Sequence, residues 1–114
     1  MKEFVFIFRG GMPDASKMTP EQMEMGMQLW QDWYAKMGDS VKDWGAALQP
    51  GGKHVVAKTG TPEDNPFQKK KDMVTGYSVV KAKSYAEASK MAKASPHLLN
   101  GGTVEVREVM PMEM

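Results

Sequence analysis

The sequence predicts an α+β fold, in which two helices cover one face of an antiparallel four-stranded sheet. Three observations predict it. Residues 4–8 are all apolar and too few for a helix, so they predict a buried strand. Two amphipathic segments, each preceded by an N-terminal capping signal, begin near residues 20 and 85. Strand-like segments follow each of them, which gives the element order β-α-β-β-α-β.

The first strand, residues 4–8, is apolar on both of its faces. Successive side chains of a strand point to opposite faces, so the three phenylalanines line one face while Val5 and Ile7 line the other. A strand that is apolar on both faces has to be covered on both. Two helices can cover only one side of a sheet, and we expect a second copy of the chain to cover the other side.

The first helix has a clear beginning and end. Thr19 can act as the N-cap, Pro20 suits the first helical position, and Gln22 can complete a capping box. Gly38 is the expected C-terminal stop. An apolar stripe predicted to pack in the core recurs at spacings of three and four residues, through Met23, Met27, Trp30, Tyr34 and Met37. Gly26 lies beside the stripe, which predicts close contact with the sheet.

The middle of the chain predicts two short strands, residues 44–48 and 53–58, joined by a tight turn at residues 49–52. We expect this hairpin, or part of it, to supply the middle strand pair. Residues 60–72 are charged and contain two prolines, so they predict an irregular polar loop. Phe67 is the bulky apolar residue of that loop. It either pins the loop to the body or closes over a pocket.

The C-terminal part predicts a strand, a helix and a strand. Residues 73–81 form the first of these strands, and Ser84 with Glu87 forms a second capping box. The helix should end before Pro96, because a residue that precedes proline avoids the helical conformation. Residues 103–110 form the last strand.

Both β-α-β crossovers should be right-handed, which places the two helices on the same face of the sheet. The order and handedness together predict the ferredoxin-like arrangement. One domain spans residues 1–114, with the polar loop at 60–72 and a C-terminal tail at 111–114. Pairing of two open sheet faces would give a homodimer of the α+β barrel type.

Composition excludes several classes of function. The 114 residues include no cysteine, which rules out disulfides, iron–sulfur clusters, cysteine-ligated zinc and cysteine nucleophiles, and fits a cytoplasmic protein. A net charge of +1 gives no general attraction to nucleic acid or to an acidic membrane. The opening apolar run is too short for a signal peptide or a membrane span. We expect neither a cofactor nor a metal site, because His54 and His97 lack metal-ligand spacing.

Several stretches resemble the YCII-related domain family. They are residues 76–80, 84–88, 96–98 and 102–109, and the segment Asp64-Asn65-Pro66-Phe67, which resembles the family's Asp-Gly-Pro-Phe signature with Asn65 in the glycine position. The resemblance implies a ferredoxin-like fold and dimers of the α+β barrel type. Some members lie beside or are fused to sigma factors. A His–Asp pair suspected of catalysis in some members has its histidine on the first helix, where this chain has none.

A candidate ligand-binding cleft is expected between the helices, the sheet and the 60–72 loop. The residues assigned to it are Arg9, Asp64, Phe67, Tyr77 and His97. His97 either acts as an acid and base or bonds main-chain carbonyls at the end of the second helix. Arg9 either holds an anionic ligand or pairs with Glu105 or Glu108. Asp64 either acts as a general base or stabilises its turn.

Three functions remain open from the sequence. The protein could bind a small molecule and catalyse a cofactor-free proton transfer, with His97 as the acid and base. It could instead be a non-catalytic ligand-sensing or protein-interaction module, tied to a transcriptional or stress response as in some relatives. An oxygenase on the same architecture is the third. The tryptophans at 30, 33 and 44 could line an apolar pocket, although helical spacing favours a core role for Trp30 and Trp33.

Overall fold

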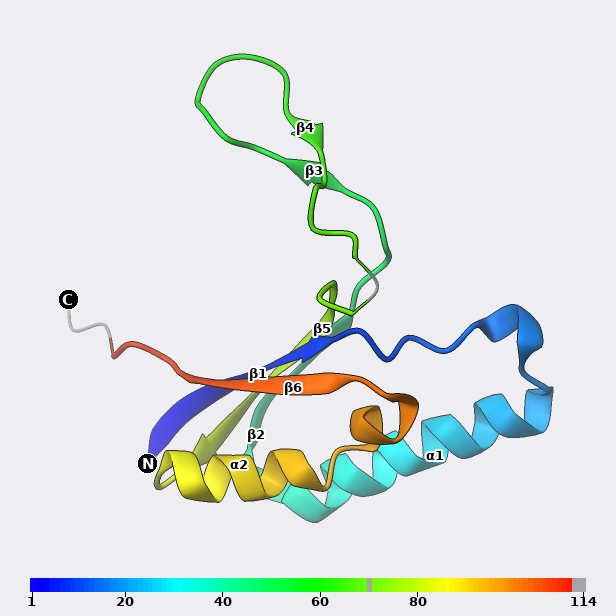
Figure 1. The fold of residues 1–114 in the computed structure, drawn as a ribbon. Coiled ribbons are helices and arrows are strands. Elements are labelled where there is room, and N and C mark those ends of the chain that lie inside the picture. Colours follow the sequence, from blue (N-terminus) through cyan, green and yellow to red (C-terminus); the bar gives the residue numbers. More distant parts are fainter. Residues whose placement is uncertain (70, 112–114) are drawn as a thin grey trace.

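A computed structural model describes residues 1–69 and 71–111 of the chain, and within them shows an antiparallel four-stranded sheet with both helices on one side (Figure 1). The strands lie in the order β2-β5-β1-β6. Their bounds are β1 Lys2–Arg9, β2 Val41–Ala47, β5 Val74–Ala82 and β6 Thr103–Glu108. The predicted α+β, ferredoxin-like fold is confirmed. Of the predicted tail 111–114, residues 112–114 lie outside the described part.

The first helix, α1 (Pro20–Met37), begins and ends where the sequence predicts. The Gln22 N–H donates to Thr19 Oγ1 at 3.1 Å, and the Thr19 N–H donates to Gln22 Oε1 at 3.0 Å, which completes the capping box. Gly38, with φ of 53°, ends the helix. Short 3-10 turns lie before and after it, η1 (Ala15–Lys17) and η2 (Gly38–Ser40).

At the start of the second helix, α2 (Tyr85–Lys93), only one of the two hydrogen bonds of the predicted capping box forms. The Glu87 N–H donates to Ser84 Oγ at 3.2 Å, but the Glu87 carboxylate accepts from the Lys83 N–H, at 3.4 Å, rather than from that of Ser84. The helix ends ahead of Pro96, as predicted, and a 3-10 turn, η3 (Pro96–Asn100), leads into β6.

The core lies between the sheet and the helices. Phe4, Phe6 and Phe8 are buried on this side, as strand alternation predicts. Phe6 stacks on Trp33 of α1 with ring centroids 6.0 Å apart. The Trp33 indole N–H donates to the Met91 carbonyl at 3.0 Å and so ties α1 to α2.

The prediction that the whole apolar stripe of α1 packs in the core is wrong for its first half. Met23 is 41% exposed and Met27 is 64% exposed. The reason is placement, because the N-terminal part of α1 extends past the sheet (Figure 1). Gly26 lies in this part, and no atom outside its own helix comes within 4 Å of where a Cβ would stand, so the predicted contact with the sheet is also wrong.

The predicted hairpin between residues 44–48 and 53–58 is also wrong. Strand β2 pairs with β5, through Val41 opposite Val80 and Ala47 opposite Gly76. Residues 53–58 contribute only β3 (Lys53–His54), which pairs with β4 (Glu63–Asp64) inside the predicted polar loop. Residues 49–68, which we call the arm, project from the body (Figure 1).

The irregular register of β2 depends on Gly45. Its φ is 73°, a conformation that favours glycine, and a Cβ there would lie 1.7 Å from the Tyr77 carbonyl oxygen. The pairing of β2 with β5 shifts on both sides of Asp43, so this strand follows β5 with local bulges. The bulged strand lies at the edge of the sheet, where such irregularities concentrate.

The other face of the sheet carries no helix among the described residues. Val5 lies between Val79 and Arg107 there, and Ile7 lies between Tyr77 and Glu105. Val5 and Ile7 are half-buried, because long neighbouring side chains flank them. We call this surface the open face.

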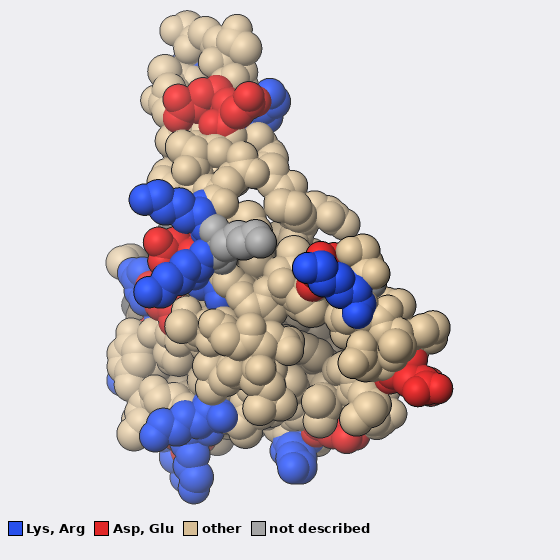
Figure 2. Space-filling model, turned by 45° about the vertical axis from the view of Figure 1, so that its right-hand side comes forward, with Lys and Arg blue, Asp and Glu red and all other residues tan. Residues whose placement is uncertain are grey.

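Charged side chains of both signs are dispersed over the view in Figure 2, with uncharged surface between them. Within the described residues, neither α1 nor α2 has the length and apolar character needed to cross a bilayer.

Candidate ligand-binding site

A cavity of about 460 Å³ lies between α1 and the strands β2 and β5. Its wall includes Phe8, Trp30, Tyr34, Trp44, Tyr77 and His97. None of the described residues that line it is Lys, Arg, Asp or Glu. The volume falls within the range that small-molecule sites occupy.

Aromatic rings form a connected wall around this cavity. The ring of Tyr34 stacks on that of Trp44, with centroids 4.9 Å apart and planes 23° apart. Trp30 lies edge-on to Phe8, with centroids 5.3 Å apart. Phe8 also lies 5.3 Å from the ring of His97. Trp44 is 62% exposed, so the cavity opens to solvent on the side of β2.

The hydroxyl of Tyr34 is bound within the protein. It lies 2.6 Å from Ser78 Oγ, and the Trp44 carbonyl oxygen lies within hydrogen-bond distance of both hydroxyls, at 3.2 and 2.8 Å. Two hydroxyls have two hydrogens, so one hydrogen joins the hydroxyls and the other goes to the carbonyl. Burial raises the pKa of Tyr34, and the hydrogen bond with Ser78 partly opposes that rise. The hydroxyl therefore stays protonated and occupied, and it is not a free group for a ligand.

His97 is only 5% exposed and is fixed at two points. Its N–H donates to Ser95 Oγ at 3.2 Å, and its ring atom Nε2 lies 2.9 Å from the Arg9 carbonyl oxygen. A carbonyl oxygen only accepts, so Nε2 carries the hydrogen. His97 thus bonds a main-chain carbonyl, as one of the two predicted alternatives has it, but this carbonyl belongs to β1 and not to the end of α2.

The remaining ring nitrogen of His97, Nδ1, has no hydrogen-bond partner among the described residues. No buried side-chain nitrogen or oxygen in this part of the chain lacks a partner, so Nδ1 keeps some accessible surface. His97 lines the cavity. In the neutral ring Nδ1 is an acceptor, so this residue of the cavity wall has one lone pair without a partner among the described residues.

Two glycines make room for the His97 ring. A Cβ on Gly102 would lie 2.2 Å from Nε2 of His97, and one on Gly11 would lie 2.8 Å from its Cε1. Such approaches are closer than heavy atoms tolerate, so the ring sits where only glycine fits. The turn Gly101-Gly102 and the end of β1 are thus shaped around the imidazole.

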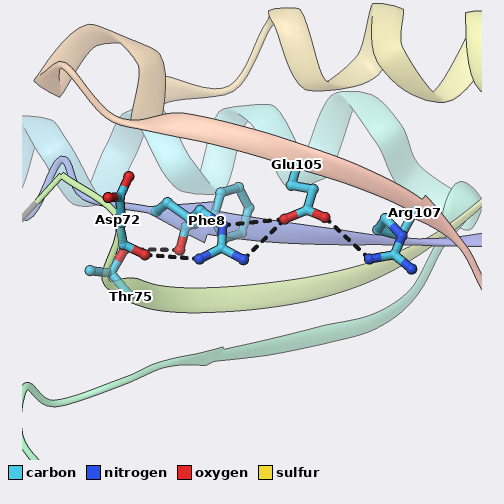
Figure 3. Close-up of polar contacts among 6 residues, drawn as sticks. Phe8, Asp72, Thr75, Glu105 and Arg107 are labelled. Carbon is cyan, nitrogen blue, oxygen red and sulfur yellow. Dashed lines mark hydrogen bonds and ion pairs between the residues drawn. The ribbon is translucent and has the colours of Figure 1, made fainter. Parts of the chain in front are cut away.

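Arg9 does not line the cavity, and its link to the cavity wall is the contact of its carbonyl with His97. Its guanidinium donates to Glu105 Oε1 from Nε at 3.2 Å and from Nη2 at 3.1 Å, and to the Asp72 carbonyl at 2.8 Å. Arg107 binds the other oxygen of Glu105 at 3.3 Å (Figure 3). Hydrogen bonds from Arg9, and then from Arg107, lower the pKa of Glu105. The pairing with Glu105 is the alternative that the structure shows for this arginine.

Asp64 and Phe67 lie on the arm and do not line the cavity. Asp64 pairs with Lys53 at 2.6 Å. Phe67 is 63% exposed, and its ring lies edge-on to that of His54, with centroids 5.0 Å apart. The intervening Asn65 shapes the turn, because its side chain donates to the Gly51 carbonyl at 2.7 Å and accepts from the Phe67 N–H at 2.9 Å.

Of the five predicted residues, the structure places His97 and Tyr77 in the cavity wall. The other three lie apart from it, and the roles of all five stay predictions. The sequence offered Trp30 and Trp44 as possible pocket residues, although a core role was favoured for Trp30, and sequence reasoning missed Phe8 and Tyr34 as members of the aromatic wall. Its signal was the set of tryptophans, of which Trp33 alone is buried in the core. Among the described residues, no group of three or more His, Asp or Glu side chains is placed to hold a metal ion.

Comparison with known proteins gives one family. The family described as "YCII-related domain" matches residues 7–113. No curated protein matches the chain. A solved structure of 5-chloro-2-hydroxyhydroquinone dehydrochlorinase (TftG) from Burkholderia phenoliruptrix AC1100, in complex with 2,5-dihydroxybenzoquinone, is similar with a TM-score of 0.49 and 17% identity. That match covers 95% of this chain and 93% of the other.

Proposed function

The chain belongs to the YCII-related domain family, and we propose that it is a homodimer that binds a small molecule in the aromatic cavity and exchanges a proton with it at His97. One observation carries the proposal. The His97 ring is buried and fixed through Nε2, while Nδ1 has no partner among the described residues and belongs to a residue of the cavity wall.

The chemistry follows from this arrangement. Nδ1 accepts a proton from the bound molecule, and the ring becomes an imidazolium whose Nε2–H already donates to the Arg9 carbonyl. That hydrogen bond holds the ring in place while Nδ1 takes up the proton. The proton then returns to another atom of the molecule or passes to solvent. No redox change is involved.

Native mass spectrometry of the purified protein tests the binding function. We expect a dimer and a retained small molecule, and we expect the Ala47→Trp variant to lose that molecule. Ala47 lines the cavity and is exposed, so the larger side chain fills the cavity without disturbing the core. Ala35→Trp, on an exposed position of α1 outside the cavity wall, is the matched control. Retention of the molecule by Ala47→Trp would contradict the assignment of the cavity.

The open face supports the homodimer. Val5 and Ile7 form an apolar strip on it. Beside that strip, the negative charge of Glu105 lies between the positive charges of Arg9 and Arg107. A surface of this kind can pair with its own copy about a two-fold axis. Analytical ultracentrifugation of the wild type and of the Ile7→Glu variant tests the dimer by giving the mass of each protein in solution. We expect the variant to dissociate, whereas a wild type that is monomeric at micromolar concentration would refute the dimer.

A ligand-sensing module is the second candidate. It is favoured by the partner of His97, which is a main-chain carbonyl, since no carboxylate bonds this ring among the described residues. A catalytic histidine commonly has such a carboxylate to orient it. Incubation of the protein with its retained molecule in D₂O discriminates the two functions. Deuterium incorporated at carbon supports proton transfer, and an unchanged molecule supports the sensing module, which we propose would act in the cytoplasm.

A further inference from the structure

We infer that the cavity selects an uncharged, planar aromatic molecule with a hydroxyl group, and that this hydroxyl donates its hydrogen to Nδ1 of His97. The inference rests on the proposed function, because it names the class of molecule that the same cavity would hold. It is carried by three properties of the wall, which are its charge, its ring surfaces and its free hydrogen-bonding atoms.

The charge of the wall excludes an anion or a zwitterion. No Lys, Arg, Asp or Glu is among the described residues that line the cavity. The nearby guanidinium of Arg9 is already bound to Glu105 and to the Asp72 carbonyl. A charged ligand would lose part of its hydration without gaining a counter-ion, which opposes its binding.

The aromatic wall favours a planar ring. Trp30, Tyr34 and Trp44 present ring surfaces around the cavity, and the pairs among them already adopt the stacked and tilted geometries that aromatic groups prefer. Such rings also attract cations. However, an ammonium group has three N–H donors to satisfy, whereas His97 offers a single acceptor at Nδ1.

The polar atoms of the cavity wall indicate why the ligand should carry a hydroxyl group. Tyr34 and Ser78 use their hydroxyls on each other and on the Trp44 carbonyl. The hydroxyl of Thr75 is likewise bound to the carbonyls of Phe8 and Gly10, at 3.3 and 3.0 Å. Among the buried side chains of the wall, His97 Nδ1 is therefore the acceptor without a partner, and the exposed Gln31 and Tyr77 carry an amide and a hydroxyl. A free acceptor calls for a donor on the ligand.

The experiment compares p-cresol with 4-methylanisole, in which a methyl group replaces the hydroxyl hydrogen and so removes the donor. Titration of the ¹⁵N-labelled wild type by NMR gives both affinities, and the indole N–H signals of Trp30 and Trp44 report the site. We expect p-cresol to bind roughly three- to tenfold more tightly, the range expected for one hydrogen bond between neutral groups. Benzoate and benzylammonium, whose charged group carries three N–H donors, are the charged probes, and we expect both to bind more weakly than p-cresol.

The variants separate this inference from the proposed function. Ala47→Trp should abolish binding of both neutral probes, and His97→Phe should remove the preference for p-cresol while 4-methylanisole still binds. Because the wild-type comparison needs no variant, it holds even if His97→Phe fails to fold. Equal affinities for the two neutral probes, or tighter binding of either charged probe, overturn the inference.

If the purified protein retains a molecule that Ala47→Trp loses, but p-cresol neither binds nor displaces it, the inference fails and the proposed function stands. If nothing is retained and no probe binds, both fail.

Discussion

Nε2 of His97 lies 2.9 Å from the carbonyl oxygen of Arg9, so a residue of η3 is fixed to the last residue of β1. The same arginine sends its guanidinium to Glu105. Arg9 thus bonds His97 through its main-chain carbonyl and Glu105 through its side chain. The geometry makes the position of the imidazole a property of the sheet rather than of a loop.

Gly102→Ala should displace His97. The added Cβ would lie 2.2 Å from Nε2, so the ring must move and its bond to the Arg9 carbonyl must lengthen or break. We expect a loss of about 1–3 kcal/mol in the free energy of unfolding, the usual cost of an extra methyl group in a filled space. Urea unfolding measures this loss, and the imidazole ¹⁵N signals of His97 should change with it. Unchanged imidazole signals would contradict the contact.

Gly26→Ala should have the opposite effect on stability. Gly26 lies inside α1, and nothing outside the helix comes within 4 Å of the position of a new Cβ. Alanine restricts the unfolded chain and favours the helix, so we expect a gain of about 0.5–1 kcal/mol. Urea unfolding of the Gly26→Ala and Gly102→Ala variants compares the effects of the two added methyl groups on the free energy of unfolding. A destabilised Gly26→Ala protein would show that this part of α1 is covered, for example by a second subunit.

Tyr34→Phe should weaken the fold and change its response to alkali. The substitution removes a buried hydroxyl that bonds Ser78 and the Trp44 carbonyl, at a cost of about 0.5–2 kcal/mol. The pKa of Tyr34 is raised by burial, so the folded protein holds this proton more tightly than the unfolded chain does. This contribution is complete below the ordinary tyrosine pKa, near pH 10, and is lost as the pH rises through the raised value.

The difference in stability between wild type and Tyr34→Phe should therefore shrink above about pH 10. Urea unfolding of both proteins between about pH 8 and pH 11 measures it. A difference that stays constant over that range would show that the hydroxyl titrates alike in the folded and unfolded states.

Glu105→Gln should alter stability in acid. Hydrogen bonds from Arg9 and Arg107 lower the pKa of Glu105, so the unfolded chain takes up this proton before the folded one does. The stabilisation is present above the ordinary carboxyl pKa and is lost as the pH falls through the lowered value. Wild type should therefore approach Glu105→Gln in stability below about pH 4.

The exposed Glu24 has no ion pair among the described residues, which makes Glu24→Gln the control. Thermal unfolding of the three proteins from about pH 3 to pH 7 measures the effect. If Glu105→Gln and Glu24→Gln show the same dependence on pH, the ion pairs of Glu105 do not contribute to stability.

Local signals in the sequence predicted most of the fold. The caps at Thr19 and Ser84 specify helix starts through contacts within one turn, and the alternation in residues 4–8 identifies the buried face. The pairing of β2 with β5 could not be predicted this way, because it joins residues 29 to 39 positions apart, from Ala47 with Gly76 to Val41 with Val80. The turn at residues 49–52 instead suggested a local hairpin between residues 44–48 and 53–58, which does not form, because β3 pairs with β4 of the arm.

The candidate site was predictable only in part for the same reason. His97 was singled out by its chemistry, but its partner, the Arg9 carbonyl, has no side-chain signature. The spacing of Trp30 and Trp33 fits a core stripe equally well for both residues. Only the offset of α1 along the sheet buries Trp33 and leaves Trp30 beside a cavity. That offset is a tertiary property, and the stripe does not encode it.

The arm has its own hydrogen bonds, and within residues 49–68 none of them runs to the four-stranded sheet. Its length can therefore vary between relatives while the strand pairing of the body stays the same. Insertions or deletions during evolution would be tolerated there first, and a family built on this body could acquire new surfaces by remodelling that appendage alone.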